Sequence, residues 1–231
     1  MTGLGALRVF EAARLTCSHA RIYQASSSEQ FGNPSNGPQD EQTPFNPISP
    51  YGCAKTFAHH CATLYRQGYK MYLSCGIAFN HESHRRGKEF VTQKIAQGVA
   101  AIHRGDCATL TLGNLEARRD WSHARDIVQA MWTILQREIP GDYVLASGES
   151  HSVKEFAQQA FRVAGLTASN HLQVDPTLYR PTDIVDLVGD IGKAQAVLGW
   201  TPLVTFEQLV EEMVHAALDA PVPHHPLREA R

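Results

Sequence analysis

Hydrophobic residues along the chain follow two spacings, one typical of helices and one typical of strands. Helical spacing recurs over residues 4–15, 51–68, 90–103 and 125–136. Shorter β-prone runs lie between these stretches, at residues 21–25, 71–79, 109–112 and 143–146. This alternation of strand and helix predicts an α/β fold built on a parallel sheet.

Two capping boxes mark further helix starts in the second half of the chain, Ser152–Glu155 and Thr205–Gln208. In each, the hydroxyl can accept from a helix N–H while the side chain three residues later reaches back to the cap. We expect helices from these positions to about residues 164 and 218. The helix-rich content after about residue 150 predicts a smaller second lobe.

Prolines and glycines interrupt the pattern between the first strand and the second helix. Residues 32–50 hold five prolines and two glycines, which exclude long regular structure. An ordered loop of this length is uncommon inside a compact domain and usually has a function. We therefore expect this loop to border a functional site.

Composition excludes several classes of partner. The 231 residues are 43% hydrophobic and 19% charged, with a net charge of −2, so no broad field favours nucleic acid or an anionic membrane. No apolar run approaches the roughly 18 residues of a membrane span. Five cysteines without paired spacing, and a start without signal-peptide features, predict a cytoplasmic protein with reduced thiols. No histidine, cysteine and aspartate set has ligand spacing, so we expect no metal site.

Candidate chemistry begins with Tyr51 and Lys55, four residues apart near a helix start. This spacing places both side chains on one helix face. An ammonium group beside a phenol stabilises the tyrosinate, which favours proton transfer. Both residue types are common on helix surfaces, so the pair alone is a weak signal.

A second polar cluster strengthens the signal. Residues Ser26–Glu29 end the first predicted strand, and ligand sites form at strand ends in parallel α/β sheets. A serine hydroxyl there can hydrogen-bond a substrate oxygen, and the adjacent carboxylate can act as an acid or a base. A serine-rich turn with Glu29 in solvent is the plainer alternative.

Several segments of the chain, among them those that carry Ser26–Glu29 and Tyr51–Lys55, together resemble the extended short-chain dehydrogenase/reductase family, and within it the GDP-mannose 4,6-dehydratases. The resemblance rests on seven segments at consistent spacing and extends from about residue 3 to residue 218: YQASSSEQFGNP, EQTPFNP, SPYGCAK, GIAFNHESHRRG, LGNLEARRDWSHARD, SGESHSVKEF and LYRPTDIVDLVGD.

The resemblance implies roles for four catalytic residues. Tyr51 would take the proton of the sugar 4-hydroxyl while hydride leaves C4 for NADP, and Lys55 would hold the nicotinamide ribose. Ser27, which stands where the family usually has threonine, would hydrogen-bond the C4 oxygen. Glu29 would remove the C5 proton and assist loss of water across C5–C6. The product would be GDP-4-keto-6-deoxymannose.

The resemblance also implies residues that bind the two ligands. His81 and Arg86 match positions that contact NADP, as do Tyr51 and Lys55. Asn80, Arg119 and Arg180 match positions that bind the nucleotide sugar; the planar guanidinium suits phosphate oxygens. The loop carrying Arg86 is similar to one that reaches a neighbouring subunit, so a homo-oligomer is implied. Trp121 and Tyr179 are expected in the core.

The chain departs from the family pattern at its start. The family begins with a strand, a glycine-rich turn and a helix that receive the dinucleotide pyrophosphate, and no such turn follows a strand here. The resemblance thus implies a partial Rossmann-like sheet lacking its first strands, with a separately encoded amino-terminal half as a candidate partner. Gln30 stands where the family has an apolar residue.

The expected domain division follows from the same resemblance. Residues 1–150 would form the later part of a dinucleotide-binding domain, with the catalytic residues, interleaved with substrate-lobe segments. Residues 151–220 would be mostly substrate lobe, and residues 221–231 a flexible tail.

Two other functions stay open. The chain could be a non-catalytic remnant that binds a sugar nucleotide or forms oligomers, or it could be a nucleotide-sugar epimerase or reductase. Glu29 argues against the latter, since those reactions need only the hydroxyl, tyrosine and lysine. NAD in place of NADP also stays open.

Overall fold

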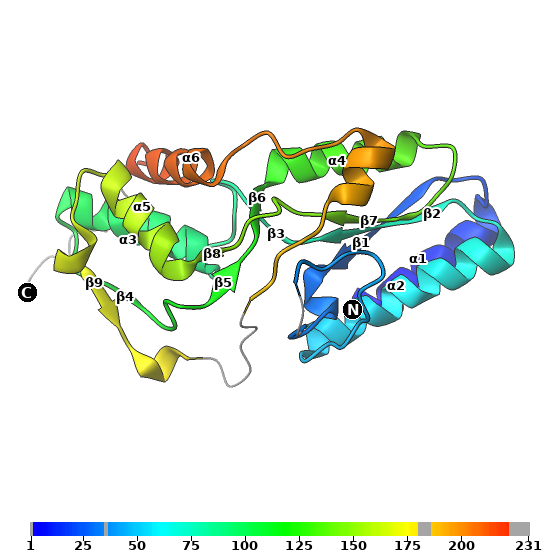
Figure 1. The fold of residues 1–231 in the computed structure, drawn as a ribbon, viewed down its shortest axis with the longest axis horizontal. Coiled ribbons are helices and arrows are strands. Elements are labelled where there is room, and N and C mark those ends of the chain that lie inside the picture. Colours follow the sequence, from blue (N-terminus) through cyan, green and yellow to red (C-terminus); the bar gives the residue numbers. More distant parts are fainter. Residues whose placement is uncertain (1, 35–36, 180–185, 222–231) are drawn as a thin grey trace, which may run out of the picture.

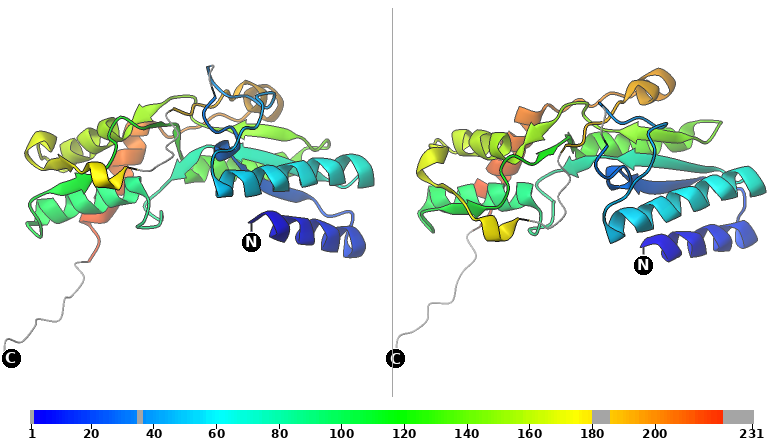
Figure 2. Two further views of the ribbon diagram at one scale, coloured as in Figure 1. Left: turned by 90° about the horizontal axis from the view of Figure 1, so that it is seen from below. Right: turned by 60° about the horizontal axis from the view of Figure 1, so that its bottom comes forward.

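The computed structural model describes residues 2–34, 37–179 and 186–221. Their elements form two lobes side by side along the long axis of the molecule (Figures 1 and 2). One lobe holds a parallel sheet with helices on both faces, and the other holds three packed helices. The predicted α/β fold with a parallel sheet is confirmed. The expected tail lies outside the described residues except for Pro221.

The sheet has three parallel strands. Strand β2 (Leu73–Ala78) lies in the centre, between β1 (Ile22–Ser27) and β7 (Asp142–Leu145). All six residues of β2 are buried, as expected for a strand covered on both faces. The carboxyl ends of β1 and β2 point toward the second lobe, which brings the serine cluster to the junction of the two lobes (Figure 1).

Helices cover both faces of this sheet. Helices α1 (Thr2–Thr16) and α2 (Pro50–Tyr69) lie on one face, and α4 (Ala124–Gln136) lies on the other (Figure 1). Phe10 of α1 packs with Leu73 of β2 in the core beneath the sheet. All three helices begin and end within two residues of the predicted positions.

The second lobe is built around α3 (Val91–Arg104), α5 (Val153–Val163) and α6 (Phe206–Leu218). Both predicted capping boxes are present, at Ser152 before α5 and at Thr205 before α6. The core of this lobe combines side chains from all three helices. The core of the second lobe therefore includes residues that come before position 150 in the sequence as well as residues that come after it.

Several short elements join the two lobes or border them, and the sequence pattern missed most of them. They are the strands β3 (Asn80–Glu82), β4 (Leu110–Leu112), β5 (Arg118–Arg119), β6 (Trp121–His123), β8 (His151–Ser152) and β9 (Leu172–Val174), the 3-10 turns η1 (Ser28–Gln30), η2 (Ala168–Asn170) and η3 (Pro176–Leu178), and the π-turn η4 (Ala194–Leu198). Only β4 was predicted. The other strands have two or three residues each, too few to show a period of two.

The described parts of the proline-rich loop between β1 and α2 contact the sheet lobe. Gln39 forms an isolated parallel bridge with Gly189, and its N–H donates to the carbonyl of Val188 at 2.8 Å. Phe31 and Phe45 pack with Ile77 and Val144 against the sheet. The loop is therefore held against the edge of the sheet lobe.

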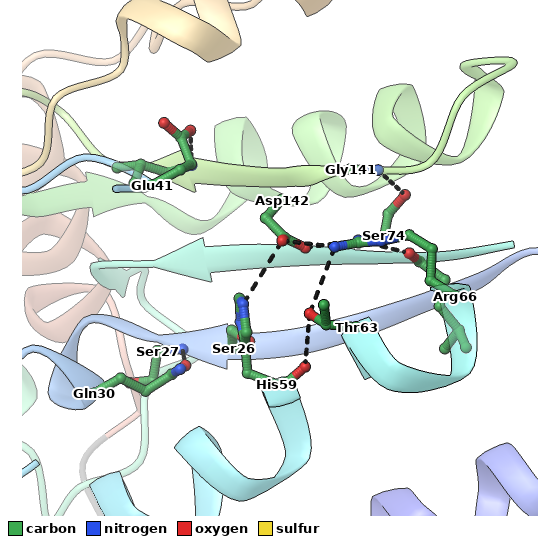
Figure 3. A network of polar contacts seen from close by, with 12 residues as sticks. Ser26, Ser27, Gln30, Glu41, His59, Thr63, Arg66, Ser74, Gly141 and Asp142 are labelled. Atoms are coloured by element: carbon green, nitrogen blue, oxygen red, sulfur yellow. Dashed lines mark hydrogen bonds and ion pairs between the residues drawn. The ribbon is translucent and has the colours of Figure 1, made fainter. Parts of the chain in front are cut away.

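A buried polar network ties α2 to the sheet (Figure 3). Two guanidinium nitrogens of Arg66 each donate to one oxygen of Asp142 at 2.8 Å. His59 places Nε2 3.7 Å from Asp142 Oδ2, and its Nδ1 lies 2.8 Å from Ser26 Oγ. The network thus runs from the start of β7 through α2 to the end of β1.

This network brings together three possible metal ligands that the sequence spacing did not group. His59, Cys75 and Asp142 bring three possible ligand atoms within 4.8 Å of one another, although their positions in the sequence are far apart. Arg66 already occupies both carboxylate oxygens of Asp142. Burial raises the pKa of the Cys75 thiol well above its usual value, which disfavours the thiolate that binds metal. The donor set therefore suits an ion pair better than a metal.

We expect the ion pair between Arg66 and Asp142 to make the protein less stable to urea as the pH falls into the acidic range. Burial alone would raise the pKa of Asp142, but the hydrogen bonds and charge of Arg66 lower it below its usual range. The stabilisation is therefore complete above the unfolded-state pKa of about 3.9 and is lost as pH falls through the folded-state value. Urea midpoints measured from pH 6 down to pH 3 should fall less steeply for Asp142→Asn than for the wild-type chain. Equal slopes would contradict this assignment.

None of the helices in the described part of the chain has the length and apolar character needed to cross a bilayer.

Candidate active site

A cavity of about 910 Å³ lies where the two lobes meet. Its walls include the carboxyl ends of β1 and β2 on one side and residues of the second lobe, such as Leu112 and Val153, on the other. Openings at the carboxyl ends of parallel strands are the usual place for ligands in α/β proteins. All four predicted catalytic residues line this cavity: Ser27, Glu29, Tyr51 and Lys55.

Tyr51 and Lys55 lie on the first turns of α2, as their spacing predicted. The Lys55 ammonium is 5.5 Å from the centre of the Tyr51 ring, and it donates a hydrogen bond to the carbonyl of Ala25 at 2.7 Å. Burial lowers the pKa of the Lys55 ammonium. The Tyr51 side chain is half exposed and faces the cavity, where a ligand can reach it.

Ser27 ends β1 and begins the η1 turn that carries Glu29. Its hydroxyl oxygen accepts from the Glu29 N–H at 3.3 Å, and its own N–H donates to Gln30 Oε1 at 2.8 Å. These bonds form a capping box, which explains a polar residue at position 30. Because the cap uses the hydroxyl as an acceptor, its hydrogen is available to donate to a substrate oxygen.

Contacts between β1 and α2 set the distance between Ser27, at the end of β1, and the pair Tyr51 and Lys55 on α2. Lys55 bonds the backbone of Ala25. His59, one turn later on the same face of α2, bonds the side chain of Ser26 (Figure 3). Burial lowers the pKa of His59, so the imidazole is neutral near pH 7. Two successive strand residues are thus held by two successive turns of the helix, next to Ser27.

Asn80, His81 and Arg86 also line the cavity, on and after β3. His81 Nδ1 lies 2.8 Å from the carbonyl of Phe79, which orients the ring, and burial lowers the pKa of the imidazole. Arg86 forms a 3.1 Å ion pair with the buried Glu82 and stacks on the Phe90 ring, with 3.5 Å between guanidinium carbon and ring centre. Arg86 is therefore fixed in the wall rather than lying in a solvated turn.

The residues expected to bind substrate are only partly described. Arg119 lines the cavity, and one of its nitrogens donates to the carbonyl of Arg118 at 2.6 Å. Arg180 lies outside the described residues. Trp121 is 2% exposed in the core of the second lobe, as expected, but Tyr179 is 49% exposed and lines the cavity, so its core assignment was wrong.

Ser49 is one of several polar residues of this wall that the sequence did not indicate as site residues. Ser49 Oγ donates to Glu29 Oε2 at 3.1 Å and also caps α2. The available signal was a serine immediately before Pro50 at a helix start, which indicates a cap but not a contact with Glu29.

Comparisons with known proteins agree on one family. The sequence profile of the family described as GDP-mannose 4,6 dehydratase matches residues 1–213. GDP-mannose 4,6 dehydratase 1 of Arabidopsis thaliana is 47% identical over 222 residues, which cover 93% of this chain and 60% of that protein. GDP-mannose 4,6 dehydratase of Homo sapiens is 44% identical over 237 residues, covering 94% of this chain and 63% of that protein. The chain thus spans about 60% of the length of these curated relatives.

Solved structures share the fold. RMD from Pseudomonas aeruginosa, complexed with NADPH, superposes with a TM-score of 0.87 at 19% identity, over 95% of this chain and 74% of that chain. The UDP-glucose 4-epimerase of Thermus thermophilus, in complex with NAD, gives a TM-score of 0.83 at 25% identity, over 94% of this chain and 70% of that chain.

Proposed function

The chain belongs to the GDP-mannose 4,6 dehydratase family, and we propose that it supplies the catalytic residues for NADP-dependent dehydration of GDP-mannose to GDP-4-keto-6-deoxymannose. The observation that carries the proposal is a carboxylate, Glu29, in the same cavity as Tyr51, Lys55 and Ser27. Oxidation and reduction at C4 need only the hydroxyl, tyrosine and lysine. The additional carboxylate favours elimination over epimerisation or simple reduction.

The residues divide the proton transfers between them. Ser27 donates to the C4 oxygen, and Tyr51 takes the proton of the 4-hydroxyl as C4 is oxidised. The ketone at C4 makes the C5 hydrogen acidic, so Glu29 suffices as the base that removes it. The C6 hydroxyl then leaves as water with the proton that Glu29 took, and C5 regains a proton as hydride returns to C6. The sum of the steps is loss of one water molecule, with no net oxidation of the nucleotide sugar.

The cavity wall suits a nicotinamide cofactor. Lys55 presents an ammonium that suits ribose hydroxyls, and His81 and Arg86 offer further polar atoms in the same wall. When bound there, the cofactor would take a hydride from C4 and return one to C6. The neighbours' cofactors, NADPH in one and NAD in the other, support a nicotinamide dinucleotide, and the match at His81 and Arg86 favours NADP.

We further propose how the lobes share the ligands. The sheet lobe would hold the cofactor and the catalytic residues, and the helical lobe would hold the nucleotide sugar. The inter-lobe cavity supports this division, with Arg119 on the side of the second lobe for the diphosphate. The substrate lobe would then comprise most of 151–220 together with segments from 1–150 that contribute to its core.

Two partner proposals follow. Exposed apolar side chains on the outer faces of α1 and α2, such as Leu4, Leu15 and Leu64, support a homo-oligomer. The glycine-rich cofactor turn expected of the family is not among the 231 residues. We propose that turnover requires a segment carrying it, whether joined to this chain or encoded apart. The chain supplied with such a segment is called the complemented chain below.

The role of Tyr51 can be tested with Tyr51→Phe in the complemented chain. Removal of the phenolic hydroxyl should lower oxidation at C4 by about 10²-fold or more, since a positioned base contributes about 10²–10⁴-fold. Absorbance at 340 nm during a single turnover of GDP-mannose would measure the oxidation. Tyr69→Phe, at the far end of the same helix, is the matched control and should react normally. An unaltered rate in Tyr51→Phe would contradict the assignment.

A further inference from the structure

One hydroxyl, that of Ser49, joins two parts of the site that come from different elements. Its oxygen accepts the N–H of Gly52 at 3.0 Å, which caps α2, the helix that carries Tyr51 and Lys55. Its hydrogen is donated to Glu29 Oε2 at 3.1 Å. Ser49 also lines the cavity, so its contact with the carboxylate lies in the wall that faces the ligand.

A second, independent contact brings the same two elements together. A side-chain carbon at Gly52 would lie 2.6 Å from the carbonyl oxygen of Glu29 and 3.0 Å from Cβ of Pro47. The 2.6 Å approach to a backbone oxygen is too short for a real Cβ, and the approach to Pro47 is already tight, so glycine lets the start of α2 lie against the η1 turn. The backbone of Glu29 is therefore held at Gly52, while its side chain is held at Ser49.

We propose that Ser49 is a positioning residue that orients the Glu29 carboxylate relative to Tyr51. The proposal rests on the proposed function and adds a residue to it. Because the Ser49 oxygen already accepts the Gly52 N–H, the Ser49 hydrogen is directed to Oε2. The other carboxylate oxygen, Oε1, is then the one available for the C5 proton.

This arrangement should matter more for elimination than for oxidation. A base acts only within hydrogen-bond reach of the proton it removes, and a misplacement of about 1 Å can cost about 10²-fold. The hydrogen bonds of Ser49 go to Glu29 and Gly52, whereas the position of α2 is also fixed by its bonds to Ala25 and Ser26. Loss of the Ser49 donor should therefore slow elimination much more than oxidation at C4.

Three substitutions distinguish positioning from capping. Ser49→Ala removes both the cap and the donor. Ser49→Asp keeps an excellent cap but cannot donate to Glu29 when ionised, and Ser49→Thr keeps both functions. In the complemented chain, the alanine and aspartate variants should lose about 10- to 100-fold in kcat for the 6-deoxy product, with KM nearly unchanged and oxidised 4-keto hexose accumulating. The threonine variant should recover most of the rate.

The results that would overturn the proposal are equally specific. A normal kcat in Ser49→Asp, or equal losses of oxidation and elimination in Ser49→Ala, would reduce Ser49 to a helix cap. If the complemented chain oxidises no sugar, the proposed function fails instead.

A second measurement, on the 231-residue chain alone, does not depend on turnover. When it is the only change, Ser49→Asp should lower the urea midpoint because its carboxylate then faces that of Glu29. It should lower the midpoint less in a Glu29→Gln background, where the amide can donate to the Asp oxygen atoms. Identical shifts in the two backgrounds would show that Ser49 and Glu29 do not interact, and would overturn the proposal whatever the activity.

Discussion

Glu29→Gln is expected to abolish the elimination step while leaving oxidation at C4 nearly intact. The amide keeps the size of the side chain and can accept from Ser49, but it cannot take the C5 proton. We expect the 6-deoxy product to form about 10³-fold more slowly, within the range that a positioned general base contributes. The oxidised 4-keto hexose should accumulate instead.

Mass spectrometry of the product in D₂O, with the complemented chain, would measure this effect. The wild type should incorporate deuterium at C5, and Glu29→Gln should not. Glu138→Gln, which changes an exposed carboxylate after α4, is the matched control and should behave as wild type. Dehydration that persists in Glu29→Gln would refute the role of Glu29 as the base that removes the C5 proton.

Arg66→Met is expected to cause the largest loss of stability. Arg66 donates two hydrogen bonds to Asp142, and both side chains are mostly buried, with 16% and 22% of their surfaces exposed. Removing the guanidinium leaves a carboxylate without its partner beneath the sheet. Breaking such a pair typically costs about 3–5 kcal/mol of unfolding free energy.

Urea unfolding at pH 7 would measure this loss. The double variant Arg66→Met with Asp142→Asn should recover a substantial part of it, because no unpaired charge then remains. Arg162→Met, on the exposed face of α5, is the control and should change the free energy of unfolding by less than about 0.5 kcal/mol. If Arg66→Met lowered the free energy of unfolding as little as Arg162→Met, the pair of Arg66 and Asp142 would contribute little to the stability of the sheet lobe.

The long elements were predictable because each carries its own signal. Helices α5 and α6 begin at capping boxes, and α2 begins at a proline after a serine, so their starts follow from local chemistry. The central strand β2 lies within residues 71–79, whose loose alternation predicted a buried strand, and all of its residues are buried. By contrast, β3 and β6 pair through residues about forty positions apart and contain three residues each, so no local pattern marks them.

The sequence indicated residues that line the cavity, but not the contacts between them. The spacing of Tyr51 and Lys55 follows from one helix turn, the end of the first predicted strand indicated the Ser26–Glu29 cluster, and the family resemblance implied roles for Ser27 and Glu29. The contact between Ser49 and Glu29, and the cluster of His59 with Asp142, depend on how β1, α2 and β7 pack together. Tyr179 was assigned to the core because aromatic residues usually lie there, whereas here it faces the cavity.

The reaction that we propose for these residues is dehydration of a GDP-linked sugar. The most direct test joins a glycine-rich cofactor segment of the family to the start of this chain, adds NADP and GDP-mannose, and identifies the sugar product by NMR. We expect GDP-4-keto-6-deoxymannose from the wild-type fusion and none from its Glu29→Gln variant. An epimerised or 4-reduced sugar, or unchanged GDP-mannose with the wild-type fusion, would contradict the proposed reaction.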